Sequence, residues 1–260
     1  MGRFDKAIKP NFGSVDMAAV WSADNYIQKL LDVEVALAKV EGRLGIIPTE
    51  AMEEIERKGK FEYLDPELYE KTLAVAGHSL VTLIRCFQAV CDNGAGQYIH
   101  WGATSQDIMD TGQTLQIREG LDIVYAKTKK LRDVLAVLAE KYRDTVMMGR
   151  THGQHALPVT LGFKIAMWVD ELDRCMERIA QARPRILSNE FFGAVGTLSA
   201  LKPEEALAIS KGLADELNLT QPKIAWFVTR DRVTEYAVLL GFVCGAIRRI
   251  AAEIFTLMRT

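Results

Sequence analysis

The chain has 260 residues, of which 49% are hydrophobic and 25% charged, and its formal net charge is −2. This balance can bury a sizeable core, and the lack of a basic surplus argues against nucleic acid or an anionic membrane as partner. The longest strongly apolar run, 236–247, is too short to span a bilayer, and the N-terminus carries no apolar signal segment. The four cysteines have no CxxC spacing and suit a reducing compartment. We therefore expect a soluble cytoplasmic protein.

Apolar residues recur at alternating spacings of three and four, which predicts long helices with one apolar stripe each. The stripes cover 26–44, 131–142, 161–179 and 237–258. Ser14 is expected to cap the first helix, and Gly42 and Gly45 to mark its end. Because no alternating strand pattern is found, the predicted fold class is all-α, a bundle of long helices.

Two domains are expected. Residues 1–110 would form an N-terminal helical domain, and 111–260 the first part of a central long-helix bundle. The last stripe runs to Thr260 without a cap, a glycine or a proline, so we expect the bundle to be incomplete in this chain.

The segment "HWGATSQDIMDTG" (100–112) places small hydroxyl residues before an expected helix. Thr104 and Ser105 would expose O–H and N–H donors that suit a carboxylate ligand. Ordinary capping by Thr104, Ser105 or Asp107 explains the same spacing, so both interpretations stay open. Asp107 and Asp110 are expected to cap or pair rather than to react.

The segment "MGRTHGQHALPVTLG" (148–162) contains two of the four histidines. His152 and His155 are three apart, but HExxH spacing is absent and no cysteine or carboxylate accompanies them, so a metal site is disfavoured. Acid–base work by a histidine is favoured. A third segment, "FFGAVGTLSAL" (191–201), could admit a ligand or simply turn the chain.

Together these segments resemble the fumarase/aspartase superfamily of elimination lyases, in the branch of adenylosuccinate lyase and 3-carboxy-cis,cis-muconate cycloisomerase. "GATSQDIMDT" and "GRTHGQHALPVTLG" match its first two signatures, and "GAVGTLSAL" a later glycine-rich stretch. The resemblance implies the long-helix bundle of that superfamily. Its third signature, a Ser-Ser-x-Met-Pro-x-Lys-x-Asn loop, is absent from these 260 residues, so the C-terminal part of the family fold is expected to be missing.

The resemblance also implies roles for individual residues. His152 matches the general acid that protonates the leaving group. The other matched positions are expected to bind or orient a dicarboxylate-bearing substrate: His78, His100, Thr104, Ser105 and Thr151. The proton-abstracting base would be a serine of the absent loop, and His155 would fix its own loop. By itself His78, in an apolar helix, is more often a satisfied core residue.

The same resemblance implies a homotetramer whose sites combine segments of three subunits. No metal and no organic cofactor is expected, because side chains and backbone donors can remove the proton, stabilise the charge and protonate the leaving group. Two departures argue against adenylosuccinate as substrate: Asn11 and Phe12 replace an Arg-Tyr pair, and Ser79 replaces an aspartate. The residues of the motifs resemble those of the cycloisomerases more closely, but His152 stands where bacterial cycloisomerases typically have tryptophan.

We therefore predict an elimination lyase that cleaves a C–N (or C–O) bond of a substituted succinate to give fumarate or a fumarate-like product, most like adenylosuccinate lyase. The alternatives are a lactonising 3-carboxy-cis,cis-muconate cycloisomerase and a non-catalytic helical oligomerisation module. The 260-residue chain alone is expected to be inactive.

Overall fold

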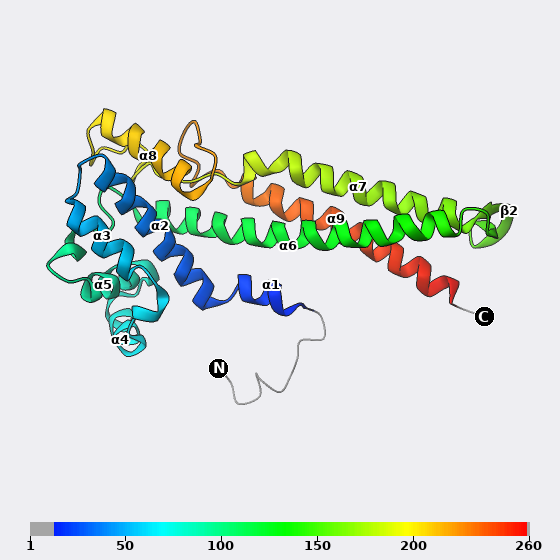
Figure 1. Ribbon diagram of the computed structural model, residues 1–260, viewed down its shortest axis with the longest axis horizontal. Coiled ribbons are helices and arrows are strands. Elements are labelled where there is room, and N and C mark those ends of the chain that lie inside the picture. The colour runs from blue at the N-terminus through cyan, green and yellow to red at the C-terminus, as the bar shows by residue number, and fades with distance from the viewer. Residues whose placement is uncertain (1–12, 259–260) are drawn as a thin grey trace. The chain divides into compact units, whose positions relative to one another are not determined.

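The computed structural model describes residues 13–258, so the Asn11–Phe12 departure lies outside the described residues. Helices dominate this part of the chain (Figure 1). In chain order the elements are α1 (Val15–Val20), α2 (Ala23–Arg43), α3 (Thr49–Lys58), the 3-10 helix η1 (Phe61–Tyr63), α4 (Pro66–Ala76), α5 (Ser79–Val90), the 3-10 helix η2 (Ala95–Tyr98), α6 (Ser105–Lys141), β1 (Val146–Thr151), β2 (Gln154–Thr160), α7 (Leu161–Ile186), α8 (Pro203–Leu217) and α9 (Asp231–Leu257). None of the helices within 13–258 is both long and apolar enough to cross a membrane.

The all-α prediction is confirmed, with one addition that the sequence patterns missed. Strands β1 and β2 form an antiparallel hairpin between α6 and α7, paired from Val146↔Thr160 to Thr151↔Gln154. The second signature therefore lies on a hairpin and not on a helix. None of the hairpin's side chains is buried and most are exposed, so no alternation of buried and exposed positions was present to reveal the strands.

The chain divides into two compact units, one within Met1–Gly120 and Leu187–Arg230, the other within Leu121–Ile186 and Asp231–Thr260. Helix α6 contributes residues to both. The expected domains, 1–110 and 111–260, stay a prediction.

In the first unit, α2 is the central helix, and it packs against α3 and α8. The predicted stripe over 26–44 is confirmed in its central part, where Leu30, Val33, Leu37 and Val40 are buried, whereas Leu44 at its end is 46% exposed. Ser14 occupies the N-cap of the first helix, α1, as predicted, but it makes no side-chain cap hydrogen bond, and α1 does not carry this stripe. The chain breaks after α1, and Ser22 caps α2 by accepting a hydrogen bond from Asn25 N at 3.2 Å.

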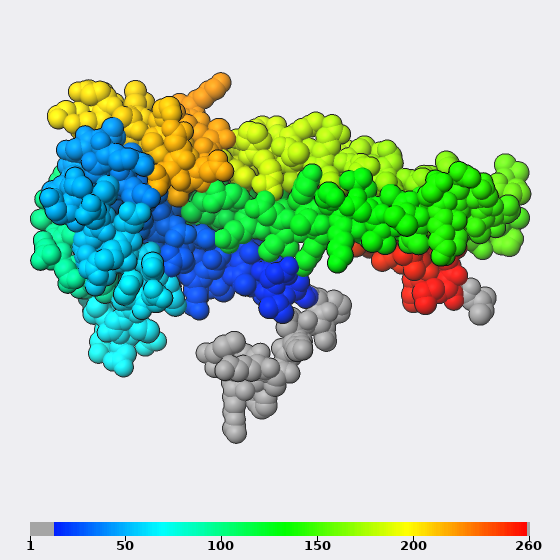
Figure 2. Space-filling view, viewed as in Figure 1, coloured from blue at the N-terminus to red at the C-terminus, as the bar shows by residue number. Residues whose placement is uncertain are grey.

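In the second unit, α7 runs antiparallel to both α6 and α9. Ion pairs Arg183–Asp122 and Arg132–Asp173 connect it to α6 in reversed order. The pairs Lys164–Glu253 and Arg185–Glu235 connect it to α9 in the same way. Figure 2 shows α6 and α7 packed along one another. The predicted stripe of α7 is confirmed, with these members buried: Ile165, Trp168, Leu172, Cys175 and Ile179.

The stripe predicted for α9 is wrong in one respect. The helix forms, but its buried residues are Tyr236, Leu239, Val243, Ala246 and Ile250. The predicted members, such as Ile247 and Ile254, are 42% and 45% exposed. Helix α9 therefore has two apolar faces, and only one of them is covered within the unit.

Candidate active site

Helix α6 begins inside the first signature, and its first turn is closed by a reciprocal pair of hydrogen bonds. Thr104 N donates to Asp107 Oδ2 at 2.9 Å, and Asp107 N donates to Thr104 O at 3.1 Å. Asp107 thus supplies one half of a capping box, in which the side chain at the third position accepts from the N-cap N–H, and the Thr104 hydroxyl takes no part in it. Thr104 and Ser105 are half-buried. Within 13–258 no hydrogen bond engages either hydroxyl, so both are available to a ligand at this helix start.

Asp107 also connects the first signature to the glycine-rich segment. Its two carboxylate oxygens accept from Phe192 N at 2.9 Å and from Gly193 N at 3.0 Å. Burial raises the pKa of Asp107, although these backbone hydrogen bonds and the charge of His100 lower it. The expectation that Asp107 caps is confirmed, and the carboxylate additionally fixes the 191–201 segment beside the start of α6.

Asp110 takes the pairing role expected of it. Its Oδ1 lies 2.8 Å from Arg230 Nη1, and the side chain is 5% exposed. One residue later, the Thr111 hydroxyl donates to Glu190 O at 3.0 Å and accepts from Glu190 N at 2.8 Å. These contacts hold α6 against the segments that precede and follow α8.

His100 lies just before the helix start and pairs with a carboxylate from α2. Its Nδ1 is 2.7 Å from Glu34 Oε1, and Glu34 is 1% exposed at its side chain. The backbone of His100 has φ 67°, a left-handed conformation that non-glycine residues rarely adopt. Burial lowers the pKa of His100, but the hydrogen bond to Glu34 and the charges of Glu34 and Asp107 outweigh it, so that the pKa is raised. The pair therefore favours the imidazolium.

Glu34 was missed in the sequence, although a signal was present. Glu34 and Glu41 are seven residues apart, directly after the stripe residues Val33 and Val40. Two carboxyls at that spacing lie along the buried side of α2, and Glu34 and Glu41 are 2% and 0% exposed. Burial, followed by the charge of Glu34, raises the pKa of Glu41 to about 9.

His78 occupies a different position from the one its sequence context suggested. It is the exposed N-cap of α5, and its Nδ1 accepts from Val81 N at 3.4 Å. The interpretation as a satisfied core histidine is therefore wrong, because the segment "AVAGHSLV" is the junction of α4 and α5. Gly77, which ends α4 with φ 63°, lets the chain turn there.

His152 and Gly153 are the two central residues of the hairpin turn, with φ 49° and 74°. Positive φ at both positions is typical of a type I′ turn, and histidine is among the residues that tolerate it. Thr151, His152 and His155 are all exposed. His155 pairs with Arg150 across the strands and does not lie in the turn.

The predicted site residues are divided between the two units. His78, His100, Thr104 and Ser105 belong to the first unit, and Thr151 and His152 to the second. Within 13–258, no group of three or more His, Cys, Asp or Glu side chains could hold a metal ion.

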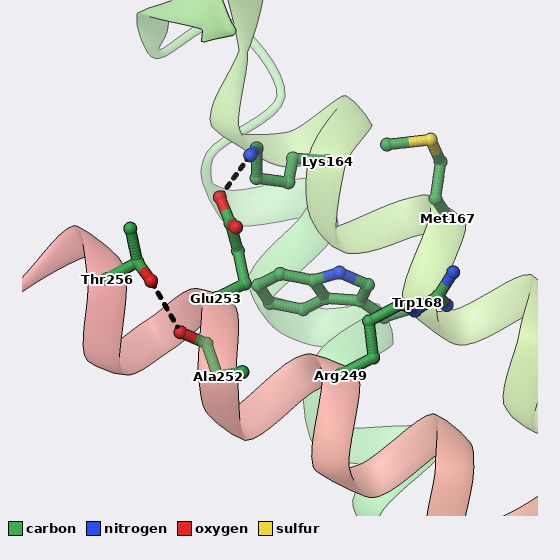
Figure 3. Close-up of a pocket in the computed structure, with 7 residues that line it drawn as sticks. All are labelled: Lys164, Met167, Trp168, Arg249, Ala252, Glu253 and Thr256. Atoms are coloured by element: carbon green, nitrogen blue, oxygen red, sulfur yellow. Dashed lines mark hydrogen bonds and ion pairs between the residues drawn. The ribbon is translucent and has the colours of Figure 1, made fainter. Parts of the chain in front are cut away.

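A separate groove of about 350 Å³ lies between α7 and α9. Figure 3 shows Trp168 at its floor and the ion pair of Lys164 with Glu253 across it. None of the predicted site residues lines this groove. Met167, which does, is 48% exposed, so the groove belongs to the incompletely covered surface of α7 and α9.

Comparison with known proteins gives a consistent family assignment. A family model described as "Lyase" matches residues 16–260. The chain is 40% identical to the adenylosuccinate lyase of Methanocaldococcus jannaschii, over 96% of this chain and 54% of that protein. It is 39% identical to the N-acetyl-S-(2-succino)cysteine lyase of Enterococcus italicus, over 97% of this chain and 55% of that protein.

The fold is also similar to that of a solved structure. The 3-carboxy-cis,cis-muconate lactonizing enzyme from Pseudomonas putida superposes with a TM-score of 0.90 at 40% identity, covering 96% of this chain and 57% of that one. The chain thus spans about half the length of the curated relatives it matches.

Proposed function

The chain belongs to the fumarase/aspartase superfamily of lyases, and on this premise we propose that the protein is an elimination lyase. It would cleave a C–N (or C–O) bond of a substituted succinate to give fumarate or a fumarate-like product. The observation that carries the proposal is the start of α6, where free hydroxyls and backbone N–H groups follow an imidazole paired with a buried carboxylate. Such a site suits a carboxylate ligand.

The reaction needs donors because a C–H bond next to a carboxylate is very weakly acidic. Removing its proton creates a second negative charge on the carboxylate, which preorganised donors must stabilise. Thr104, Ser105 and Thr151 would bind this group, and His78 and His100 would orient the substrate. His152 would protonate the leaving atom. The base is assigned to none of the 260 residues, because the family resemblance predicts a serine on a loop that this sequence does not contain.

We further propose a homotetramer in which neighbouring subunits complete each site. The uncovered apolar face of α9 supports this, because large exposed apolar patches mark association surfaces. Ile247, Ile254 and Phe255 on that helix are 42%, 45% and 62% exposed. The exposed hairpin carrying Thr151 and His152 would then reach the α6 start of another subunit. A cytoplasmic location stays a prediction, which the four free cysteines support.

This assembly can be tested by mixing two inactive variants of the full-length protein. Thr104→Ala and His152→Asn subunits, dissociated and reassembled together, should regain part of the activity, since some mixed sites contain neither substitution. Light scattering would report the oligomeric state. If the mixtures stay as inactive as each variant alone, the proposal that each site combines residues of several subunits is contradicted.

The substrate is tested with three compounds suggested by the relatives: adenylosuccinate, N-acetyl-S-(2-succino)cysteine and 3-carboxy-cis,cis-muconate. Elimination produces a new C=C bond conjugated with carboxylates, which is detected by ultraviolet absorbance, whereas lactonisation expels no group. The cycloisomerase remains the second candidate because its solved relative has the same fold at 40% identity. No product from any of the three would favour the non-catalytic module.

The role of His152 is tested best by His152→Asn, because asparagine tolerates positive φ and Asn-Gly is a preferred type I′ turn. The variant removes the imidazole and keeps the hairpin. Turnover should fall by about 10²–10⁴, the usual contribution of a positioned proton donor. His155→Gln, on the same hairpin outside the turn, is the matched control and should retain turnover. Full activity of His152→Asn would refute the assignment.

A further inference from the structure

Glu34 is a buried carboxylate that pairs with the imidazole of His100. Its side chain is 1% exposed, and His100 is its only ion-pair partner within 13–258. Oε1 contacts His100 Nδ1 at 2.7 Å, while Oε2 is buried and has no hydrogen-bond partner there. A buried charge with one partner is strongly unfavourable unless that partner is charged as well. The arrangement therefore ties the charge of His100 to Glu34.

The neighbouring acidic groups cannot take over this role. Among the described residues, the acidic groups that interact electrostatically with the pair are Glu41 from α2 and Asp107 from α6. Glu41, whose pKa is about 9, is neutral at pH 7. Both Asp107 oxygens are occupied by backbone N–H groups of Thr104, Phe192 and Gly193. Of the acidic side chains that the structure describes, Glu34 is the one placed to hold the ring of His100.

The contact also determines which edge of the ring is available. With Nδ1 engaged by Glu34, only Nε2 can meet a ligand, and in the imidazolium both nitrogens are donors. The side chain of His100 is 18% exposed, so the ring is neither sealed in the core nor free in solvent. The left-handed backbone of His100 turns the chain directly into the α6 start.

We propose that Glu34 is a positioning residue that holds His100 through Nδ1 and presents Nε2–H as a cationic donor to a substrate carboxylate bound at the start of α6. The proposal rests on the proposed function for the identity of the ligand. Glu34 itself would not touch the substrate. It would act on binding and on the chemical step, because the carboxylate at the start of α6 is bound in the ground state and gains charge in the transition state.

The experiment compares Glu34→Gln with Glu41→Gln in the full-length protein. Glu34→Gln keeps the shape and an oxygen acceptor but removes the charge, whereas Glu41→Gln replaces one neutral group by another. With the best substrate, Glu34→Gln should lower kcat/KM by about 10-fold or more, through both kcat and KM, the loss expected for a charge-assisted hydrogen bond. Glu41→Gln should leave both constants unchanged. Adding Glu34→Gln to His100→Gln should cause no further loss, since the two residues act as a unit.

Two measurements do not depend on turnover. In histidine-labelled protein, the NMR titration of His100, identified by its loss in His100→Gln, should move to lower pH in Glu34→Gln. Calorimetric binding of fumarate by the unsubstituted protein should weaken as pH rises through the His100 titration. Both measurements can be made even if no substrate is turned over. Failure of the proposed function can therefore be distinguished from failure of the role proposed for Glu34. An unchanged His100 titration in Glu34→Gln would overturn the proposal. So would a fumarate affinity that does not change over the pH range in which His100 titrates.

Discussion

Replacing Glu41 by glutamine should stabilise the fold by an amount that increases with pH. Both carboxyl oxygens of Glu41 are buried without a hydrogen-bond partner within 13–258. Burial, with the charge of Glu34 second, raises the pKa from 4.5 to about 9. Between these two values the folded protein binds one more proton than the unfolded chain, in which the carboxyl ionises. Stability therefore falls as pH rises through this window.

The magnitude follows from the size of the pKa difference. At pH 5 the carboxyl destabilises the fold by about 1 kcal/mol, and at pH 7 by about 3 kcal/mol, at about 1.4 kcal/mol for each pH unit above the unfolded pKa. Glutamine ionises in neither state and removes this contribution. The gain in the free energy of unfolding should thus be about 3 kcal/mol at pH 7 and about 1 kcal/mol at pH 5.

Urea unfolding followed by circular dichroism, at pH 5 and pH 7, measures both values for the protein and the variant. Glu53→Gln is the matched control, because Glu53 is an exposed glutamate of α3 and its replacement should change stability little at either pH. The informative quantity is the difference between the two pH values. A Glu41→Gln gain that is the same at pH 5 and pH 7 would refute the argument, because the effect would then not come from ionisation.

Three further predictions concern local structure, each measured as the free energy of unfolding. Asp107→Ala leaves three backbone N–H groups without their acceptor and should cost about 3 kcal/mol or more, with Asp107→Asn intermediate; an equal loss in both would contradict this account. Gly162→Ala should cost about 1–3 kcal/mol, because its Cβ would lie 2.4 Å from Ala139 O and 2.6 Å from Arg143 Cα; a neutral effect would mean that α6 and α7 are not so close. Ser22→Ala removes the cap of α2 and should cost about 1 kcal/mol, whereas Ser14→Ala should cost less, because Ser14 makes no side-chain cap hydrogen bond.

The elements whose sequence signal is local were predicted well. The stripes over 26–44 and 161–179 identify helices that bury those residues, because helical periodicity depends on spacing within one segment. The starts of helices were less predictable. Ser14 and Ser22 are equally good caps by type, and only the break after α1 decides between them.

The stripe of α9 illustrates a different limit. The helix has apolar residues on two faces, and periodicity detects either of them. The face with Leu239 and Val243 is buried within the unit, and the face with Ile247 and Ile254 is exposed. Which face a helix buries depends on the elements packed against it. An apolar face that packs on another subunit has the same spacing in the sequence as one that packs within its own chain.

For the site, too, the sequence revealed the residues that lie in recognisable motifs but not the backbone conformation that presents them. The signature residues Thr104, Ser105 and His152 were identified by type and order along the chain. The turn that carries His152 was not, because a hairpin with exposed side chains leaves no periodic trace.

The sequence by itself determined that this is a helical protein of a lyase family and which histidines and hydroxyls are candidates for its site. These properties depend on spacing and residue type within short segments. Only the tertiary structure decided that Glu34 holds His100 and that Asp107 fixes the 191–201 segment. Those contacts join residues 66 and 85–86 positions apart, and packing, not local propensity, selects such partners.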